Sequence, residues 1–173
     1  MKKRILLTSF TTWLPDQKSN SSDDLLFEVT KLDSLPCDLQ FLRLLPVDIG
    51  LASAEVIAKI EEDQPDYIVC CGMAAGREKL SVEMGASCGE TFLQTPIDLE
   101  KLIIGARATD ISDDCGKFVC EGLYYSVLNY LGQKQLSSHC VFVHVPVLNQ
   151  DNLLVILADF VLIINNLALL SNN

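Results

Sequence analysis

Short apolar runs alternate along this chain with longer segments that have helical spacing, and this alternation constrains the fold more than any other feature. The runs typical of buried strands are residues 4–10, 39–45, 67–71 and 141–147. Residues 50–63 and 115–131 instead carry apolar side chains three and four positions apart, as one face of a helix requires. Strands that alternate with helices predict an α/β fold of three layers, α/β/α, with a mixed, mostly parallel central sheet.

The remaining segments have weaker patterns. Residues 79–86 are expected to form another strand, and residues 25–32 a helix that residues 22–24 cap at its N-terminus. Residues 88–97 are typical of turns. Residues 99–104 fit a strand or a short helix equally well, so both interpretations stay open.

Length, composition and charge exclude several classes of protein. With 173 residues, of which 49% are hydrophobic and 21% charged, the chain is expected to be one folded domain over residues 1–173. The formal net charge is −10, and beyond the short basic run of residues 2–4 lysine and arginine form no cluster. Binding to phosphate backbones requires a basic face, so no nucleic-acid partner is expected.

The cysteines indicate a compartment. There are seven of them, an odd number, and they form no paired CxxC motifs with the spacing of zinc ligands. Only Ile5 to Leu7 follow the basic residues 2–4, which is too short for a secretory signal. We therefore expect a cytoplasmic protein in which most thiols act as small buried hydrophobic groups.

One segment raises the question of a membrane. Residues 153–170 are almost entirely apolar, but Asn152, Asp159 and Asn166 recur every seven residues and form one polar stripe. A spanning helix would place Asp159 near the middle of the bilayer, at a high cost in free energy. The segment is better explained as a helix buried in the core or between subunits, which predicts a homo-oligomer and no membrane partner.

Few residues offer catalytic chemistry. The sequence contains no HExxH, phosphate-binding loop, GxGxxG or GxSxG motif, so no metal and no cofactor are expected. It has two histidines, and His144 is the polar residue in the apolar run 141–147. Strand ends are common places for active sites, so His144 is either a catalytic base or a core histidine bonded to a backbone carbonyl.

A thiol and a carboxylate accompany this histidine as candidates. Cys120 is predicted near the start of a helix that Asp113 and Asp114 cap, where the helix N-terminus would lower the pKa of a thiol. The alternative is that Cys120 fills the apolar stripe of that helix. Glu83 lies in the expected strand 79–86 and either belongs to a site or faces solvent.

Six segments of the chain form a recognisable series: ILLTSF (residues 5–10), RLLPV (43–47), GMAAGR (72–77), SVE (81–83), GKFVC (116–120) and FVHVP (142–146). In this order they resemble the pyroglutamyl peptidase (pyrrolidone carboxyl peptidase) family. The resemblance implies a cysteine peptidase that acts on small peptides without a cofactor. It implies that Cys120 is the nucleophile, His144 the base and Glu83 the third member of a triad. It also implies that Phe10 and Trp13 hold the lactam ring of the substrate.

The chain departs from the family pattern near these residues. Residues 85–96 are shorter than in the family and lack its arginine, and Glu121 replaces an asparagine directly after Cys120. The Glu121 carboxylate is expected to raise the pKa of the thiol through like charge. Two hypotheses follow: an active peptidase with an altered pocket, or a homologue without turnover that binds a small ligand or a protein. Retention of all three triad residue types favours catalysis.

Overall fold

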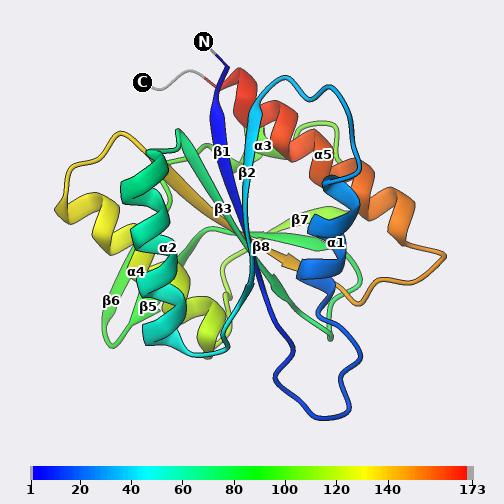
Figure 1. Ribbon diagram of the computed structural model, residues 1–173, viewed down its shortest axis with the longest axis horizontal. Helices are drawn as coiled ribbons and strands as arrows, with labels where there is room; N and C mark the ends of the chain where they lie inside the picture. Colours follow the sequence, from blue (N-terminus) through cyan, green and yellow to red (C-terminus); the bar gives the residue numbers. More distant parts are fainter. Residues whose placement is uncertain (1, 171–173) are drawn as a thin grey trace.

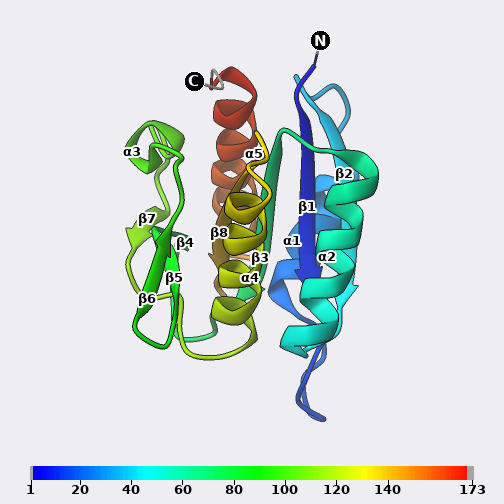
Figure 2. The ribbon, with the colours of Figure 1, turned by 90° about the vertical axis from the view of Figure 1, so that its left-hand side faces the viewer.

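The computed structural model describes residues 2–170, and a central sheet lies between two layers of helices (Figures 1 and 2). The strands are β1 (Arg4–Phe10), β2 (Asp38–Leu45), β3 (Tyr67–Met73), β4 (Leu80–Glu83), β5 (Gly85–Cys88), β6 (Thr91–Gln94), β7 (Thr109–Ser112) and β8 (His139–Val145). The helices are α1 (Ser21–Val29), α2 (Ile49–Asp63), α3 (Leu99–Leu102), α4 (Val119–Gln133) and α5 (Leu153–Leu169).

The main sheet has six strands in the order β2-β1-β3-β8-β4-β7. The first four are parallel to one another, β4 is antiparallel to β8, and β7 is parallel to β4. Strands β5 and β6 form a separate antiparallel hairpin. The predicted three-layer fold with a mixed, mostly parallel sheet is therefore confirmed.

The two helix layers bury opposite faces of the sheet. Helices α1, α3 and α5 share one hydrophobic core with the sheet, and α2 and α4 share the other. In β1, Ile5 and Leu7 point into the first core while Leu6 and Phe10 point into the second, because successive side chains of a strand alternate between faces. A strand covered on both faces must be apolar at nearly every position, which explains the unbroken run of residues 4–10.

The polar stripe of α5 faces the protein. The Asp159 carboxylate, which is 4% exposed, accepts hydrogen bonds from the backbone of Arg107 and Ala108 and from the Thr109 hydroxyl. The Asn166 amide donates to the Leu102 carbonyl at 2.8 Å. The stripe thus holds the segment between α3 and β7, and no helix within residues 2–170 combines the length and apolarity needed to cross a bilayer.

Two predicted helix starts are wrong. The cap of α1 is Asn20 rather than residues 22–24: its side chain accepts from the Ser22 N–H at 3.0 Å, while Asp23 pairs with Arg43 at 2.8 Å. Helix α4 begins at Val119 rather than at residue 115, and its N-cap, Phe118, makes no side-chain cap bond.

The aspartates before α4 have another role. Asp114 accepts a hydrogen bond from the N–H of Gly116 at 3.0 Å, and Gly116 has a φ of 82°. This left-handed conformation, which glycine adopts readily, closes a turn and prevents the helix from extending back toward residue 115. Asp113 and Asp114 therefore precede the helix without capping it.

The strand predictions were less accurate in the middle of the chain. The expected strand 79–86 is divided, because the chain leaves the main sheet after Glu83 and enters the hairpin at Gly85. Segment 88–97 contains β6 of that hairpin, and segment 99–104 contains the short helix α3. The edge strand β7 was not predicted, since its sequence TDIS has one large apolar residue and no alternation.

Candidate active site

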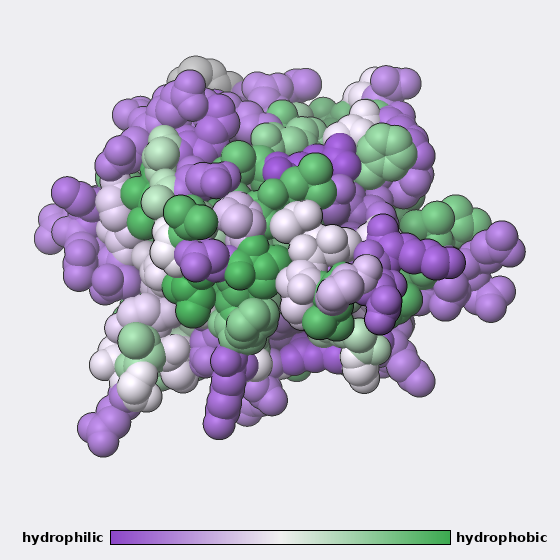
Figure 3. Space-filling view, turned by 60° about the horizontal axis from the view of Figure 1, so that its bottom comes forward, coloured by the Kyte–Doolittle hydropathy of each residue, from purple (hydrophilic) through white to green (hydrophobic). Residues whose placement is uncertain are grey.

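A cavity of about 140 Å³ lies where β1, β3 and β8 end and α4 begins. Its lining residues are Phe10, Trp13, Asn20, Val47, Met73, Cys115, Gly116, Lys117, Phe118, Val119, Cys120 and His144. The carboxyl ends of parallel strands are the usual place for a site in an open α/β sheet. In Figure 3, where the lower end of the molecule comes forward, apolar surface gathers in the middle of the face and polar residues surround it.

The antiparallel pairing of β4 with β8 brings the predicted carboxylate and imidazole together. Residue Ser81 pairs with His144, and Glu83 pairs with Phe142. The Nδ1 atom of His144 lies 2.7 Å from Oε1 of Glu83. A carboxylate can only accept a hydrogen bond, so this contact favours the tautomer with its proton on Nδ1 and leaves Nε2 as an acceptor.

Both side chains of this pair are held tightly. Glu83 is fully buried and His144 is 5% exposed. The ring of Phe142 lies with its centroid 4.9 Å from that of the imidazole. Arg77 also donates to Oε1 of Glu83, at 2.5 Å. The imidazole is therefore fixed on one side by a hydrogen bond and on another by an aromatic ring.

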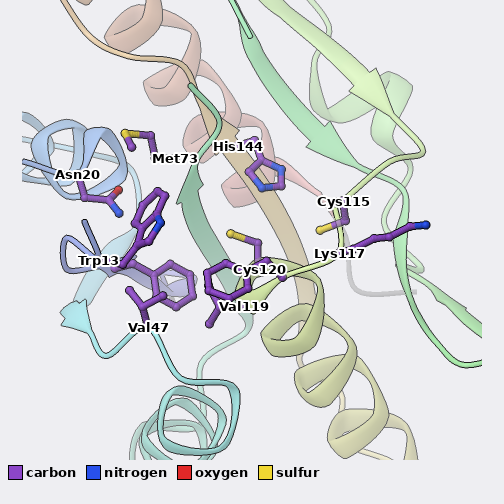
Figure 4. A pocket seen from close by; sticks show the side chains of 12 residues that line it. Trp13, Asn20, Val47, Met73, Cys115, Lys117, Val119, Cys120 and His144 are labelled. Carbon is purple, nitrogen blue, oxygen red and sulfur yellow. The ribbon is translucent and has the colours of Figure 1, made fainter. Parts of the chain in front are cut away.

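Cys120 is the second residue of α4 and is partly buried. Figure 4 shows its sulfur and the His144 imidazole pointing into the same cavity, with Trp13 and Val47 on the opposite side from Cys115. The imidazole of β8 and the carboxylate of β4 are thus in direct contact, and the thiol of α4 lines the same cavity as the imidazole. Within residues 2–170, no hydrogen bond joins the Cys120 sulfur to His144.

The pKa of Cys120 does not follow the prediction. Burial raises it from an ordinary 9.0 to about 12, and the neighbouring Cys70 and Glu83 add to this effect. The backbone hydrogen bond at the helix start lowers the pKa but does not outweigh burial. The sequence predicted that the helix N-terminus would lower the pKa of Cys120, and this prediction is wrong, because the net effect is a rise. Glu121, which was expected to raise this pKa, is not among the groups that do so, and its carboxylate accepts a hydrogen bond from the Ser87 N–H at 3.0 Å.

A raised pKa predicts a distinctive pH dependence for alkylation of Cys120. Its thiolate fraction should grow about tenfold per pH unit from about pH 7 to pH 10, because the titration midpoint lies higher, at about 12. The rate with iodoacetamide, followed by mass spectrometry of the peptide that contains Cys120, should rise in parallel. The exposed Cys88 should first be replaced by serine. A rate that levels off at or below pH 9 would contradict the burial argument.

The two predicted ring-binding residues both line the cavity. Phe10 is 2% exposed at the end of β1, whereas Trp13 is 41% exposed in the following loop. The backbone N–H of Trp13 donates to the Gln17 side chain at 3.0 Å, and the Gln17 amide lies 3.8 Å from the sulfur of Met73. This loop is therefore held against the end of β3.

Sequence reasoning missed several lining residues. Met73 belongs to GMAAGR and Phe118 to GKFVC, so the motifs contained the signal although neither side chain was assigned to the site. The side chain of Asn20 is already hydrogen-bonded within the protein, because its amide donates to the Thr11 carbonyl and its oxygen accepts from Ser22. Within residues 2–170, no three His, Cys, Asp or Glu side chains are grouped as ligands for a metal ion.

Comparison with known proteins bears on this site. A family model described as pyroglutamyl peptidase matches residues 98–158, which include Cys120 and His144. A pyrrolidone-carboxylate peptidase of Brevibacillus brevis is 27% identical over 175 residues, with 86% of this chain and 80% of the relative covered. One from a Thermoanaerobacter species is 31% identical over 134 residues, with 60% of this chain and 64% of the relative covered.

Solved structures of pyroglutamyl peptidases have the same fold as this chain. Pyroglutamyl peptidase I of Bacillus amyloliquefaciens superimposes with a TM-score of 0.86 over 98% of each chain, at 18% identity. A mutant pyrrolidone carboxyl peptidase of Pyrococcus furiosus gives a TM-score of 0.80 over 96% of this chain and 98% of that one, at 20% identity. The resemblance predicted from the sequence motifs is therefore confirmed: in sequence and in fold, this chain is similar to the pyroglutamyl peptidases.

Proposed function

We propose that this protein is a cysteine peptidase that hydrolyses the amide bond after an N-terminal pyroglutamyl residue, or a closely related ring, in small peptides. The observation that carries the proposal is the hydrogen bond between His144 and the buried Glu83, beside a cavity that the Cys120 thiol also lines. A nucleophile beside a base that a third group orients is the usual arrangement for acyl transfer.

In the proposed reaction, Cys120 Sγ attacks the carbonyl carbon of the scissile amide while Nε2 of His144 accepts the thiol proton. His144 then gives that proton to the leaving amine as the C–N bond breaks, and a thioester remains on Cys120. Water hydrolyses the thioester with His144 again as the base, which releases the free acid and restores the thiol. Because the pKa of Cys120 is about 12, the proton leaves during attack rather than before substrate binds.

The start of α4 is suited to stabilise the oxyanion that forms in both steps. The first N–H groups of a helix have no partner within the helix, and Phe118 supplies no side chain to cap them. Donors fixed in advance beside the reacting carbonyl stabilise the developing negative charge without reorganising. Positive partial charge at the helix N-terminus contributes in the same direction.

The walls of the cavity support a neutral ring as the acyl group. Phe10, Trp13 and Val47 provide apolar surface, and the ammonium group of Lys117 extends away from the Cys120 sulfur (Figure 4). A ring with no net charge loses little hydration free energy when it enters such a cavity, whereas a free α-ammonium group loses much more.

Turnover of fluorogenic amides tests the proposal. Pyroglutamyl-aminomethylcoumarin should release its fluorophore, while the prolyl and glutaminyl analogues, which carry an α-amino group, should react at least about a hundredfold more slowly. The tryptophan fluorescence of the chain, which has one Trp at position 13, should report ligand binding separately. Binding of pyroglutamate without release of any fluorophore would reject the peptidase and favour a homologue that only binds.

The close approach of Cys120 to Gly72 gives a further prediction. A Cβ atom at Gly72 would lie 2.5 Å from the Cys120 sulfur and 2.9 Å from the Phe142 ring. Gly72→Ala should displace the nucleophile and lower kcat about a hundredfold, with a loss of about 1–3 kcal/mol in the free energy of unfolding.

Gly76→Ala is the matched control for this variant. A Cβ at Gly76 meets no atom within 4 Å, so kcat and the free energy of unfolding should both stay near those of the unaltered protein. Steady-state kinetics and urea unfolding measure the two effects. If Gly72→Ala keeps full activity, Cys120 does not need its observed position for the reaction.

A further inference from the structure

Arg77 connects two parts of the site that come from different elements. It lies in the turn after β3, where its backbone N–H donates to the Ala74 carbonyl at 3.0 Å. Its Nη1 donates to Oε1 of Glu83 and its Nη2 donates to the carbonyl of Asp114, both at 2.5 Å. One planar guanidinium group thus contacts the carboxylate of the proposed triad and the segment that leads to the nucleophile.

Glu83 depends on this contact for charge compensation. Its side chain is fully buried, and its Oε2 has no hydrogen-bond partner within residues 2–170. All of its side-chain hydrogen bonds therefore converge on Oε1, from Arg77 on one side and His144 on the other. Removing a partner from a buried charge leaves that charge uncompensated, and the side chain then moves or rearranges its contacts. The orientation of the imidazole would change with it.

The second contact bears on the nucleophile. The Asp114 carbonyl lies six residues before Cys120, in a turn that continues through Gly116 to the first residue of α4. A guanidinium group holds two acceptors in a fixed relative geometry, because its five N–H donors lie in one plane. A lysine in this place has one nitrogen and cannot reproduce both directions.

We propose that Arg77 is a positioning residue of the active site, one that fixes the carboxylate–imidazole pair relative to the segment carrying the nucleophile. The effect of Arg77 on turnover rests on the proposed peptidase function. Arg77 acts through Glu83 and the turn at Asp114, and it does not contact the reacting atoms. Its side chain is 27% exposed, so a small cation from solvent can reach the place it occupies.

The kinetic test compares Arg77→Met, Arg77→Lys and Arg77→Ala with the unaltered protein. In Arg77→Met, kcat for pyroglutamyl-aminomethylcoumarin should fall about a hundredfold while KM changes less than about threefold, because misplaced groups lower the rate more than binding. The kcat of Arg77→Lys should lie between that of Arg77→Met and that of the unaltered protein. Guanidinium ion at about 50 mM is far below denaturing concentrations, and it should raise the kcat of Arg77→Ala by about fivefold or more.

Lys79→Met is the matched control. Lys79 also carries a cation and lies close in sequence, but it pairs with Asp110 at the surface, where both side chains are at least half exposed. Its kinetics should not change. A kcat for Arg77→Met within twofold of the unaltered protein would overturn the inference, as would a loss that guanidinium ion does not restore in Arg77→Ala.

A second measurement separates this inference from the proposed function. Alkylation of Cys120 by iodoacetamide, measured in a Cys88→Ser background, needs no peptidase activity. It should be at least about tenfold slower in Arg77→Ala and should recover with guanidinium ion. If the unaltered protein cleaves no substrate and this dependence is found, the peptidase proposal fails and the role of Arg77 stands. If alkylation is independent of Arg77, the positioning role fails whether or not the protein is a peptidase.

Discussion

Cys120→Ala is expected to lower kcat/KM for a pyroglutamyl amide by about 10⁴-fold or more, because the variant has no atom that can form the thioester. The fold should persist, since alanine fits in the space of a small, partly buried cysteine at the start of α4. Steady-state kinetics and circular dichroism measure the two outcomes. This is the largest effect that the proposed mechanism predicts for a single substitution.

Cys115→Ser is the discriminating comparison, because Cys115 is the other thiol that lines the cavity. Cys115 is 4% exposed, and burial, with the nearby Glu83, raises its pKa far above the ordinary value. It is therefore less suited to attack than Cys120, and its loss should cost less than about tenfold in kcat. If the two variants exchange these results, the nucleophile has been assigned to the wrong cysteine.

Glu83→Gln is expected to produce the second large effect, a fall in kcat of about 10³- to 10⁴-fold. Glutamine keeps the shape of the side chain but removes the negative charge that orients Nδ1 of His144 and stabilises the imidazolium formed during attack. The substitution also leaves the guanidinium of Arg77 without its ionic partner. Because Arg77 is 27% exposed, we expect a moderate loss of about 1–3 kcal/mol in the free energy of unfolding.

Glu78→Gln provides the control for charge and shape. Glu78 lies next to Arg77 but is exposed, so neither kcat nor the urea midpoint should move appreciably. A Glu83→Gln variant with more than a tenth of the original kcat would show that the buried carboxylate serves the fold rather than the reaction.

The sequence predicted the elements whose pattern is set by burial. Strand β3 is covered on both faces and is apolar at nearly every position, so its existence follows from residues 67–71 alone. Strand β7 pairs with one neighbour at the sheet edge and has the sequence TDIS, which carries no such pattern. The start of α4 was misplaced because a glycine turn, stabilised by Asp114, interrupts a stripe that continues in the sequence.

The site was only partly predictable, because its geometry depends on contacts between distant residues. His144 and Glu83 are 61 positions apart and meet through the antiparallel pairing of β4 with β8, which no local pattern encodes. The resemblance to a family suggested the pair, and the backbone pairing explains it. The pKa of Cys120 was misjudged for the same reason: burial by neighbouring elements outweighs the local effect of the helix start.

Some expectations from the sequence stay predictions. These are the homo-oligomer, the cytoplasmic location and the organisation of residues 1–173 as one domain. Analytical size-exclusion with light scattering decides the first of them, and a monomer at all concentrations would reject it.

The central claim is that Cys120 carries the acyl group of the substrate during turnover, and trapping that group tests it most directly. The protein should be mixed with a pyroglutamyl ester, quenched in acid within milliseconds, digested and analysed by mass spectrometry. The account predicts one pyroglutamyl group on the peptide that contains Cys120, formed before steady state and absent when the Glu83→Gln variant is treated for the same time. An acyl group on another residue, or release of product with no acylated peptide at any time, would contradict it.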